Sequence, residues 1–495
     1  FFKQKTAYEI GVRLVGSEMC IRDRTECEYG TTPTLGNNVN LGGNEVTHSI
    51  AITGLQPATI YKVQCYSVSG NDTAFSSVGT YSTASNSSGK IRTYFNHSVD
   101  NSFSIGVDAQ NITSYFNDTI KAYMDLAQST LDICVYNASD ATIATAINDA
   151  YNRGVQVRYI ADDDVTNTML SSLNTNIPIV YRDNSLAGIM HNKFIIIDAN
   201  STTNSWVMGG SCNWTNPTNL FNDYNNIIFI QDQSIAQAYT AEFNEMWGGV
   251  FGTNKEDNTP HLFNVNGTKV EVYFSPSDGT NAKIESFINN VDYSIEIALL
   301  SFTRNDLGSS VINKNDEFGV NIRGILESQN TTGSEYDNLI NAGVNVRSHM
   351  GIPYQIHHKY AIADVNVAGS DPTILTGSHN WSTNAESNSD ENSMFIHSQT
   401  IANIYLQEFE ERWNELTTSV NESSNIDIDI FPNPSRNQVN ILSEEIINLI
   451  KIYDVEGKFL KSTTSNQFEL SSSGIYFIKV NLDNGSYIIK KLIIQ

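Results

Sequence analysis

The sequence predicts an α/β protein in which two homologous α/β/α halves form a pseudo-twofold unit, flanked by a β-sandwich at each end. Strand and helix patterns alternate through the middle of the chain, which is typical of layered α/β domains. Several motifs in that region occur twice, at an offset of 166 or 167 residues. The regions before and after it contain short alternating apolar and polar runs, which indicate all-β modules.

Composition excludes some classes of protein. The chain has 495 residues, with 29 Lys and Arg against 54 Asp and Glu, and a formal net charge of −25. This charge argues against a protein that grips long nucleic acids or an anionic membrane, because both need clustered cations. No apolar run approaches the ~18 to 20 residues of a spanning helix. The five cysteines include no CxxC pair and predict neither a zinc site nor a disulfide framework.

Residues 1–24 are basic on an acidic chain and lack an initiating Met. They resemble translated sequencing-adapter read-through, so we expect them to be non-native and the native N-terminus to be missing. A degraded signal peptide is the alternative interpretation, but charges at Glu9, Arg13 and Glu18 interrupt any apolar core.

Residues 25–85 are expected to form a truncated β-sandwich. Leu55, Pro57 and Tyr61 resemble the tyrosine-corner region of fibronectin type III domains, in which a Tyr hydroxyl caps a strand crossover. An unrelated small β-sandwich is the alternative. The following stretch, 83–89, has the composition of a linker.

The two central halves are expected at 90–250 and 268–416, joined by a polar segment near 252–267. Strands are predicted at 131–136, 155–160, 294–300, 320–326 and 344–347, and helices at 141–152 and 336–342. An apolar stripe at helical spacing marks the end of each half and predicts core packing. Its members are Ile235, Tyr239, Phe243 and Trp247 in the first half, and Ile401, Tyr405, Phe409 and Trp413 in the second.

Residues 426–495 are expected to form a second all-β module without chemistry of its own. The runs FPNPSRNQVNI, IKIYDVEGKFL, GIYFIKV and KKLII resemble, in order and terminal placement, the C-terminal sorting domain of type IX secretion cargo. The resemblance implies export by that machinery across the outer membrane of a Bacteroidota-type bacterium, removal of the domain, and release or attachment at the cell surface. A carbohydrate-binding β-sandwich is the alternative.

Two paired motifs carry the chemistry. Each half contains His-x-Lys-x4-Asp followed by Gly-Ser-x-Asn-Trp. On a strand, residues i and i+2 project to one face, so each half offers an imidazole beside an ammonium, and a hydroxyl beside an amide. Attack on a phosphodiester needs one group to attack phosphorus and another to protonate the leaving oxygen. The two halves are therefore expected to meet face to face within one chain, so that a monomer suffices.

These motifs resemble the HKD signatures of the phospholipase D superfamily, with a likeness that covers about 90–416. The resemblance implies a phosphohistidine intermediate, later hydrolysed or passed to an alcohol, and no metal or other cofactor. It implies His191 as nucleophile and His357 as general acid. The other residues predicted to belong to the catalytic motifs are Lys193, Lys359, Asp198 and Asp364, of which the lysines hold the phosphate oxygens and the aspartates are expected to tie the strands and not to touch substrate. The residues predicted to bind the substrate phosphate are Asn213 and Asn380, supported by Ser211 and Ser378.

Family members commonly orient each catalytic histidine by a carboxylate downstream of the second motif. Glu391 occupies that position in the second half, and the 166-residue offset places Asn225 in the first. We expect Glu391 to raise the pKa of His357, which suits an acid, and Asn225 to leave His191 unprotonated and nucleophilic.

Three other features have simpler interpretations. His358 beside His357 suggests a metal pair, but adjacent strand residues face opposite ways. The acidic run 162–164 could bind calcium, although a solvated loop is expected. Trp214 and Trp381 could stack on substrate or pack against the core.

Together these observations predict a secreted phosphodiesterase, with phospholipids slightly preferred as substrate. A metal-independent endonuclease is the first alternative, and a surface adhesin with idle catalytic motifs is an alternative of another class. Basic lining of the cleft would favour the nuclease, and an apolar rim would favour the lipase.

Overall fold

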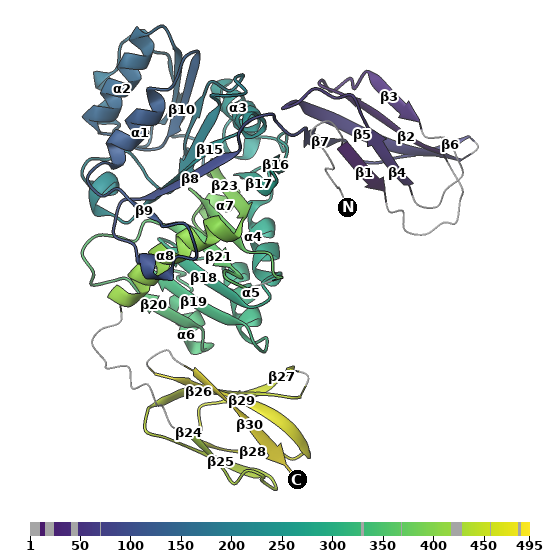
Figure 1. Cartoon of the computed structure of the whole chain (residues 1–495), viewed down its shortest axis with the longest axis vertical. Helices are drawn as coiled ribbons and strands as arrows, with labels where there is room; N and C mark the ends of the chain where they lie inside the picture. Colours follow the sequence, from purple (N-terminus) through teal and green to yellow (C-terminus); the bar gives the residue numbers. More distant parts are fainter. Residues whose placement is uncertain are drawn as a thin grey trace.

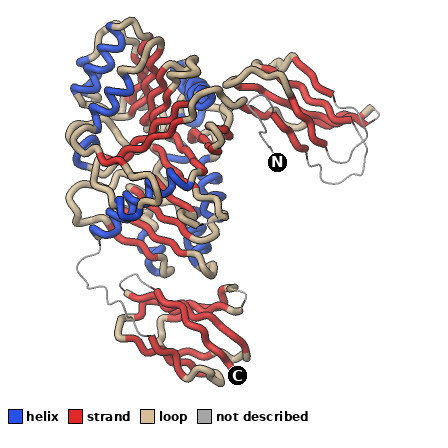
Figure 2. The backbone as a smooth tube through the Cα atoms, in the orientation of Figure 1, coloured by secondary structure: helices blue, strands red, loops and turns tan. Residues whose placement is uncertain are grey.

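The computed structural model describes residues 10–14, 24–40, 48–69, 71–327, 331–367, 369–416, 428–455, 457–483 and 487–495. Two eight-stranded sheets with helices occupy the middle of the molecule, and a β-rich module lies at each end (Figure 1). Figure 2 shows the helices in blue, concentrated around these two sheets. The predicted α/β class is confirmed. No helix of the described part is long and apolar enough to span a membrane.

The first half is built on a sheet of strand order β12-β11-β10-β13-β14-β15-β8-β9. The strands are β8 (Lys90–Phe95), β9 (Gln110–Asn111), β10 (Thr130–Val135), β11 (Gln156–Asp162), β12 (Ile179–Arg182), β13 (Lys193–Ile197), β14 (Trp206–Gly210) and β15 (Asn226–Gln231). The helices are α1 (Phe116–Met124), α2 (Ala141–Asn152) and α3 (Gln233–Trp247). Strands β10 to β12 are parallel, whereas β13 to β15 form an antiparallel meander.

The second half repeats this plan with the order β16-β17-β23-β22-β21-β18-β19-β20. The strands are β16 (Leu262–Val265), β17 (Thr268–Ser275), β18 (Ser294–Leu299), β19 (Asn321–Leu326), β20 (Asn345–Ser348), β21 (Lys359–Ala363), β22 (Thr373–Gly377) and β23 (Glu391–His397). The helices are α4 (Thr280–Asn289), α5 (Asn305–Asn315), α6 (Tyr336–Asn341), α7 (Thr383–Ser387) and α8 (Gln399–Glu415). Strand β16 lies inside the polar segment that was expected only to join the halves. It pairs with β17 at the edge of this sheet, and its Phe263 and Val265 are buried in the core.

Local sequence explains where the main helices begin. Asp140 precedes α2 and accepts a hydrogen bond from the backbone N–H of Ile143. Asp232 caps α3 and Ser398 caps α8 in the same way. Helix α2 is followed by Gly154, whose φ of 90° suits a residue without Cβ.

The predicted apolar stripes lie in the core between the two sheets. The Tyr239 ring of α3 packs edge-on against Phe274 of β17, with centroids 4.9 Å apart. Tyr405 of α8 packs in the same manner against Phe95 of β8 at 5.3 Å. Each terminal helix thus contacts the sheet of the other half, and one hydrophobic core joins the halves.

The N-terminal module has a sheet of order β3-β2-β5-β6, with β7 paired to β5, and a separate pair of β1 and β4. Its strands are β1 (Ile10–Leu14), β2 (Arg24–Gly30), β3 (Asn37–Asn40), β4 (His48–Ile52), β5 (Ile60–Ser69), β6 (Asp72–Phe75) and β7 (Gly79–Ser82). The Tyr61 hydroxyl accepts a hydrogen bond from the Gln56 N–H at 3.1 Å, close to the expected strand crossover. Most of 1–24 lies outside the described residues, and its non-native origin stays a prediction.

The cysteines predicted no disulfide framework, but the described part of the chain contains one disulfide. Cys27 and Cys65 are bonded, because the antiparallel register of β2 and β5 places them directly opposite each other. The two cysteines are 38 residues apart, so rules based on short cysteine spacings could not predict this pairing. The stretch 83–89 is also ordered, since the Ser85 hydroxyl donates to Asp232 at the start of α3.

The C-terminal module consists of two sheets, of order β24-β25-β28 and β27-β26-β29-β30. Its strands are β24 (Ile428–Phe431), β25 (Gln438–Ser443), β26 (Ile447–Tyr453), β27 (Phe459–Thr463), β28 (Gln467–Glu469), β29 (Gly474–Leu482) and β30 (Tyr487–Ile494). It contacts the second half through the ion pair between Lys451 and Asp316, with an N–O distance of 2.6 Å. The Phe318 ring packs against Phe477 beside this pair.

Candidate active site

The two histidine-lysine motifs lie where β13 and β21 begin. Each lysine is the first residue of its strand, and each histidine precedes it by two residues. The Nζ of Lys193 donates to the carbonyl of His191 at 2.7 Å, and Lys359 does the same to His357 at 2.6 Å. All four side chains are buried. Each ammonium is therefore held against the backbone of its own histidine.

The halves exchange their orienting residues. His191 of the first half contacts Glu391 of the second, with an Nδ1–Oε2 distance of 2.8 Å. His357 of the second half contacts Asn225 of the first, with an Nδ1–Oδ1 distance of 2.9 Å. The predicted pairing of Glu391 with His357 and of Asn225 with His191 was wrong. The offset identifies equivalent positions, but docking around the pseudo-twofold axis places each of them at the histidine of the other half.

Backbone contacts fix this exchange. The N–H of His191 donates to the carbonyl of Asp390, which precedes Glu391, at 2.9 Å. The N–H of His357 donates at the same distance to Tyr224, which precedes Asn225. Each histidine is thus held by main chain from the other half, next to the residue that contacts its ring.

The two serines of the second motifs support the orienting residues. Ser211 donates to Asn225 Oδ1 at 2.8 Å and accepts from the Asn226 N–H at 3.1 Å. Ser378 accepts from the Asn392 N–H at 3.1 Å. Both serines are fully buried, so neither has direct access to substrate, and their predicted part in binding the substrate phosphate can only be indirect.

The residues before these serines must be glycines, because the backbone of the neighbouring strand lies too close for a side chain. Gly210 and Gly377 have φ values of 128° and 155°. A Cβ at either position would clash with the carbonyl oxygen of Asn226 or Asn392 on the neighbouring strand. This close approach brings each serine next to the segment that carries an orienting residue.

The asparagines of the second motifs have unused hydrogen-bonding capacity. The Oδ1 atoms of Asn213 and Asn380 are buried without a hydrogen-bond partner in the described part of the chain. Buried polar atoms normally have partners, so each of these amide oxygens can accept a hydrogen bond from a donor group, whereas a phosphate oxygen would have to be bound by the amide NH₂ of the same side chains.

The two motif aspartates tie the backbone and do not face the histidines. Asp198 accepts hydrogen bonds from the N–H groups of Gln128, Ser129 and Thr130, at 2.7 to 2.9 Å. Asp364 does the same for 292–294, at 2.7 to 3.0 Å. These contacts lie at the far ends of β13 and β21 and anchor the start of β10 and β18.

Burial dominates the electrostatics of the site. Burial and the two nearby ammonium groups hold the pKa of both His191 and His357 well below the ordinary value. Burial lowers the pKa of Lys193 to about 7 and that of Lys359 well below its usual range. Burial raises the pKa of Glu391 to about 7, although Lys193 opposes this. An anion beside these groups would favour the cationic form of each of them, so the site suits a negatively charged ligand.

The alternative interpretations of other residues find no support. Trp214 and Trp381 are buried in separate hydrophobic cores and cannot stack on substrate. His358 contacts Glu408 through Nε2 at 3.1 Å and Asn226 through Nδ1, so both ring nitrogens are occupied. The run 162–164 is not a fully solvated loop, because Asp162 is buried and accepts two backbone hydrogen bonds.

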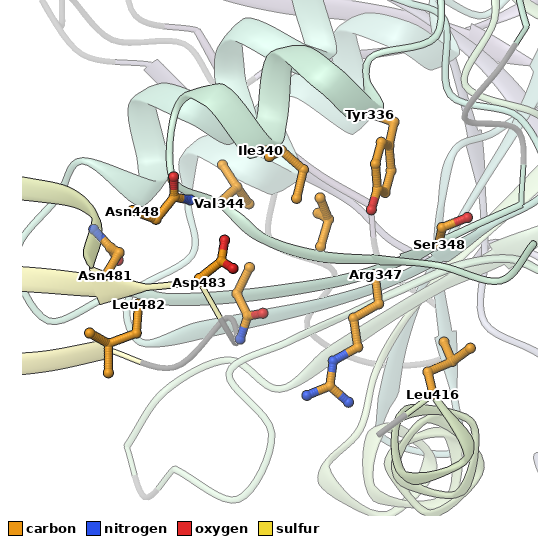
Figure 3. A pocket seen from close by; sticks show the side chains of 13 residues that line it. Tyr336, Ile340, Val344, Arg347, Ser348, Leu416, Asn448, Asn481, Leu482 and Asp483 are labelled. Atoms are coloured by element: carbon orange, nitrogen blue, oxygen red, sulfur yellow. The ribbon is translucent and has the colours of Figure 1, made fainter. Parts of the chain in front are cut away.

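One metal-competent group occurs among the described residues, namely Asp257, His261 and Asp278, whose ligand atoms lie within 4.8 Å of one another. Both ring nitrogens of His261 already contact protein oxygens, those of Val272 and Asp257. The group shares no residue with the paired motifs. A hollow of about 400 Å³ between the second half and the C-terminal module is also separate, and its lining includes Tyr336, Arg347 and Asp483 (Figure 3).

Sequence reasoning missed an ion network that joins the halves beside His191. Arg182 contacts Asp390 at 3.2 Å, and Lys255 contacts both Asp390 at 3.3 Å and Glu242 at 2.5 Å. The repeat gave no signal for it, because the offset of Asp390 leads to Tyr224 in the first half.

A family model described as "Cardiolipin synthase, PLD-like domain" matches residues 120–247 and 284–413, which is more than half of the chain. The chain belongs to this phospholipase D-like family. Each matched segment contains one pair of motifs and six of the eight strands of one sheet, without β8 and β9 in the first half and β16 and β17 in the second. A second model, "Secretion system C-terminal sorting domain", matches 429–495. This domain directs export by the type IX secretion system to the cell surface or outside.

Curated relatives of this phospholipase D-like chain include two proteins named mitochondrial cardiolipin hydrolase. The protein from Chlamydomonas reinhardtii is 32% identical over 127 residues, and that from Canis lupus familiaris is 34% identical over 124 residues. Each match covers 25% of this chain, and 54% and 46% of the relatives. The chain thus spans about half the length of the curated relatives it matches.

Similar solved structures include the phospholipase D family member Nuc from Salmonella typhimurium, at 27% identity and a TM-score of 0.26. That match covers 30% of this chain and 95% of the other. The phosphatidylserine synthase of Haemophilus influenzae is 13% identical with a TM-score of 0.45, covering 66% of this chain and 86% of the other.

Proposed function

We propose that this exported protein hydrolyses phosphodiesters through a phosphohistidine intermediate on His191, with His357 as general acid. The observation that carries the proposal is the exchange across the halves, which gives the two histidines different partners. Membership of the phospholipase D-like family supports the same chemistry.

Glu391 makes His191 the better nucleophile. When the carboxylate is ionised, it accepts a hydrogen bond from Nδ1–H. The ring proton then stays on Nδ1, and the Nε2 lone pair is free to attack phosphorus. The same carboxylate stabilises the positive charge that the ring acquires when the N–P bond forms. The nucleophile predicted from the sequence is retained, but for the opposite reason, since a carboxylate and not an amide faces it.

Asn225 makes His357 the better acid. A neutral amide oxygen orients the ring without stabilising the imidazolium as strongly as a carboxylate would, so the protonated ring gives up its proton readily. His357 is expected to gain that proton when an anionic phosphate enters, since the charge of the ligand offsets the low pKa of the buried ring.

The reaction then runs in two balanced steps. In the first, the Nε2 lone pair of His191 forms a bond to phosphorus, the P–O bond to the leaving group breaks, and His357 protonates the leaving oxygen. In the second, His357 takes a proton from water, the water oxygen bonds to phosphorus, and the P–N bond breaks. Lys193, Lys359, Asn213 and Asn380 are proposed to hold the non-bridging oxygens in both steps.

The surroundings of the site favour an ester with an apolar portion, such as a phospholipid. The segments 183–190 and 349–356, which lead into the two histidines, contain no Lys or Arg. The second of them exposes Met350 at 47% and Tyr354 at 55%. A nucleic acid would need clustered cations along its backbone, whereas a lipid is compatible with exposed apolar side chains such as these two.

The test is hydrolysis by the purified chain, in EDTA, of phosphatidylcholine vesicles, single-stranded DNA and bis-p-nitrophenyl phosphate. We expect cleavage of the lipid and of the small diester, loss of both in His191→Ala, and retention in the matched control His261→Ala. Cleavage of DNA alone would assign the chain to the endonucleases. No cleavage of any substrate would refute the enzymatic proposal and favour an adhesin.

A further inference from the structure

Asp162 contacts the segment that carries the proposed nucleophile. It is the last residue of β11 and is buried. Its Oδ2 accepts a hydrogen bond from the N–H of Met190 at 2.6 Å, and its Oδ1 accepts from the Asp164 N–H at 2.7 Å. Since Met190 directly precedes His191, this carboxylate acts on the nucleophile through one peptide unit.

Glu327 makes the corresponding contact in the second half. It directly follows β19, which occupies the place of β11 in the second sheet. Its Oε2 accepts from the N–H of Ile356 at 2.8 Å and contacts Nδ1 of the buried His349 at 3.0 Å. Ile356 directly precedes His357. The two carboxylates thus take equivalent places, although neither belongs to a repeated motif and one is Asp and the other Glu.

We propose that Asp162 and Glu327 are positioning residues, each of which fixes one of the two reacting histidines through the N–H of the preceding residue. This inference rests on the proposed function. Each histidine-bearing segment is held twice, by the carboxylate of its own half and by the main chain of the other half. With the carboxylate removed, a buried N–H loses its acceptor and the histidine is held from one side only.

The consequence for catalysis is large, because a misplacement of about 1 Å can cost about 10²-fold in rate. The two residues should also affect different steps. Asp162 acts through the nucleophile, so its loss slows attack on every substrate. Glu327 acts through the acid, so its loss slows the first step only when the leaving oxygen needs a proton, whereas hydrolysis of the phosphohistidine, in which His357 is the base, slows on either substrate.

The experiment compares Asp162→Ala, Glu327→Ala and Glu327→Gln in the full chain. The substrates are bis-p-nitrophenyl phosphate, whose leaving group departs without a proton, and phosphatidylcholine, whose leaving group needs one. The Gln variant keeps an oxygen that can accept both hydrogen bonds of Glu327. Charge-matched controls are the exposed Asp163→Asn and Asp337→Asn.

We expect Asp162→Ala to lower kcat on both substrates by about 10²-fold. Glu327→Ala should lower kcat on the lipid by a similar factor and leave the first-turnover burst of p-nitrophenolate from the small diester within about twofold, with recovery of the lipid kcat in Glu327→Gln. KM and the controls should stay within about twofold. Variants equal to the controls would overturn the inference, as would equal losses of both Glu327 variants on both substrates, which indicate a folding defect. An inactive wild-type chain would refute the proposed function itself and this inference with it.

Discussion

Glu391, the first residue of β23, contacts Nδ1 of His191 at 2.8 Å, although the two residues belong to different halves of the chain. The reciprocal contact joins Asn225 of the first half to His357 of the second. Neither half therefore contains a complete histidine site, and the different partners explain why two similar motifs can have different roles.

Replacement of Glu391 by Gln should slow formation of the phosphohistidine by about 10²-fold, because the ring loses the carboxylate that stabilises its positive charge. The pKa of Glu391 is raised to about 7 by burial, so the wild-type rate should rise as pH increases through about 7. Rapid-quench trapping of labelled phosphate on His191 measures the first effect, and a pH-rate profile the second. A Gln variant that forms the phosphohistidine at the wild-type rate, and whose pH-rate profile still rises through about pH 7, would contradict this prediction.

Replacement of Asn225 by Asp should shift the alkaline limb of the pH-rate profile, where the rate falls as pH rises, to higher pH. A carboxylate beside Nδ1 favours the imidazolium and raises the pKa of His357, and a general acid works while it is protonated. The measurement is kcat against pH for phosphatidylcholine. With bis-p-nitrophenyl phosphate, which needs no acid, the limb should not move, and a shift on both substrates would argue against His357 as the acid.

Anion binding should take up protons above neutral pH. The pKa of Lys193 is lowered to about 7 by burial, so without a bound anion the ammonium loses its proton as pH rises through this value. A bound phosphate favours the charged lysine and raises its pKa, so binding restores the proton and affinity falls as pH rises. Calorimetry of inorganic phosphate at pH 8, in buffers of different ionisation enthalpy, measures the uptake. Lys193→Met should reduce the number of protons taken up. A binding enthalpy that does not depend on the buffer would show that no proton is taken up and would contradict the prediction.

Removal of Asp390 should destabilise the joint between the halves. Asp390→Ala leaves Arg182 and Lys255 buried without this carboxylate, and breaking a buried pair costs about 3 to 5 kcal/mol. Denaturant unfolding measures the loss, with Asp337→Asn as an exposed control expected within about 0.5 kcal/mol. A loss no larger than that of the control would show that the network adds nothing to the joint.

Reduction of the Cys27–Cys65 bond should affect only the N-terminal module. This module has its own hydrophobic core, separate from that of the two halves. Cys27→Ala/Cys65→Ala is expected to lower the stability of the module by about 2 to 4 kcal/mol, and diester hydrolysis should not change. Parallel thermal unfolding and activity assays test this, and a joint loss of both would show that the module supports the site.

Much of the fold could be predicted from the sequence. Apolar periodicity indicated most of the central elements, and the repeated stripe from Ile235 to Trp247 marked two equivalent halves. These signals come from residues close together in the sequence, so a single sequence is enough to detect them. The strand β16 was not predicted because it has only four residues, of which Phe263 and Val265 are buried, and this pattern is too short to stand out in a polar segment.

The long-range pairings could not be predicted. The partner of His191 depends on how two folded halves dock, and the 166-residue offset is the same for either pairing. The Cys27–Cys65 bond depends on the register of two strands. Asp162 belongs to an acidic run that suggests a solvated loop, but backbone N–H groups satisfy its carboxylate and allow its burial.

The exchange of Glu391 and Asn225 also bears on the order of events during export. A chain whose first half alone has folded holds His191 without its carboxylate and His357 without any partner, so neither histidine is oriented. The sorting domain that directs export is at the C-terminal end and is synthesised after both halves. Any step that keeps the halves from docking before export would therefore keep the site incomplete inside the cell, and the phosphodiesters of the producing cell would be protected without a separate inhibitor.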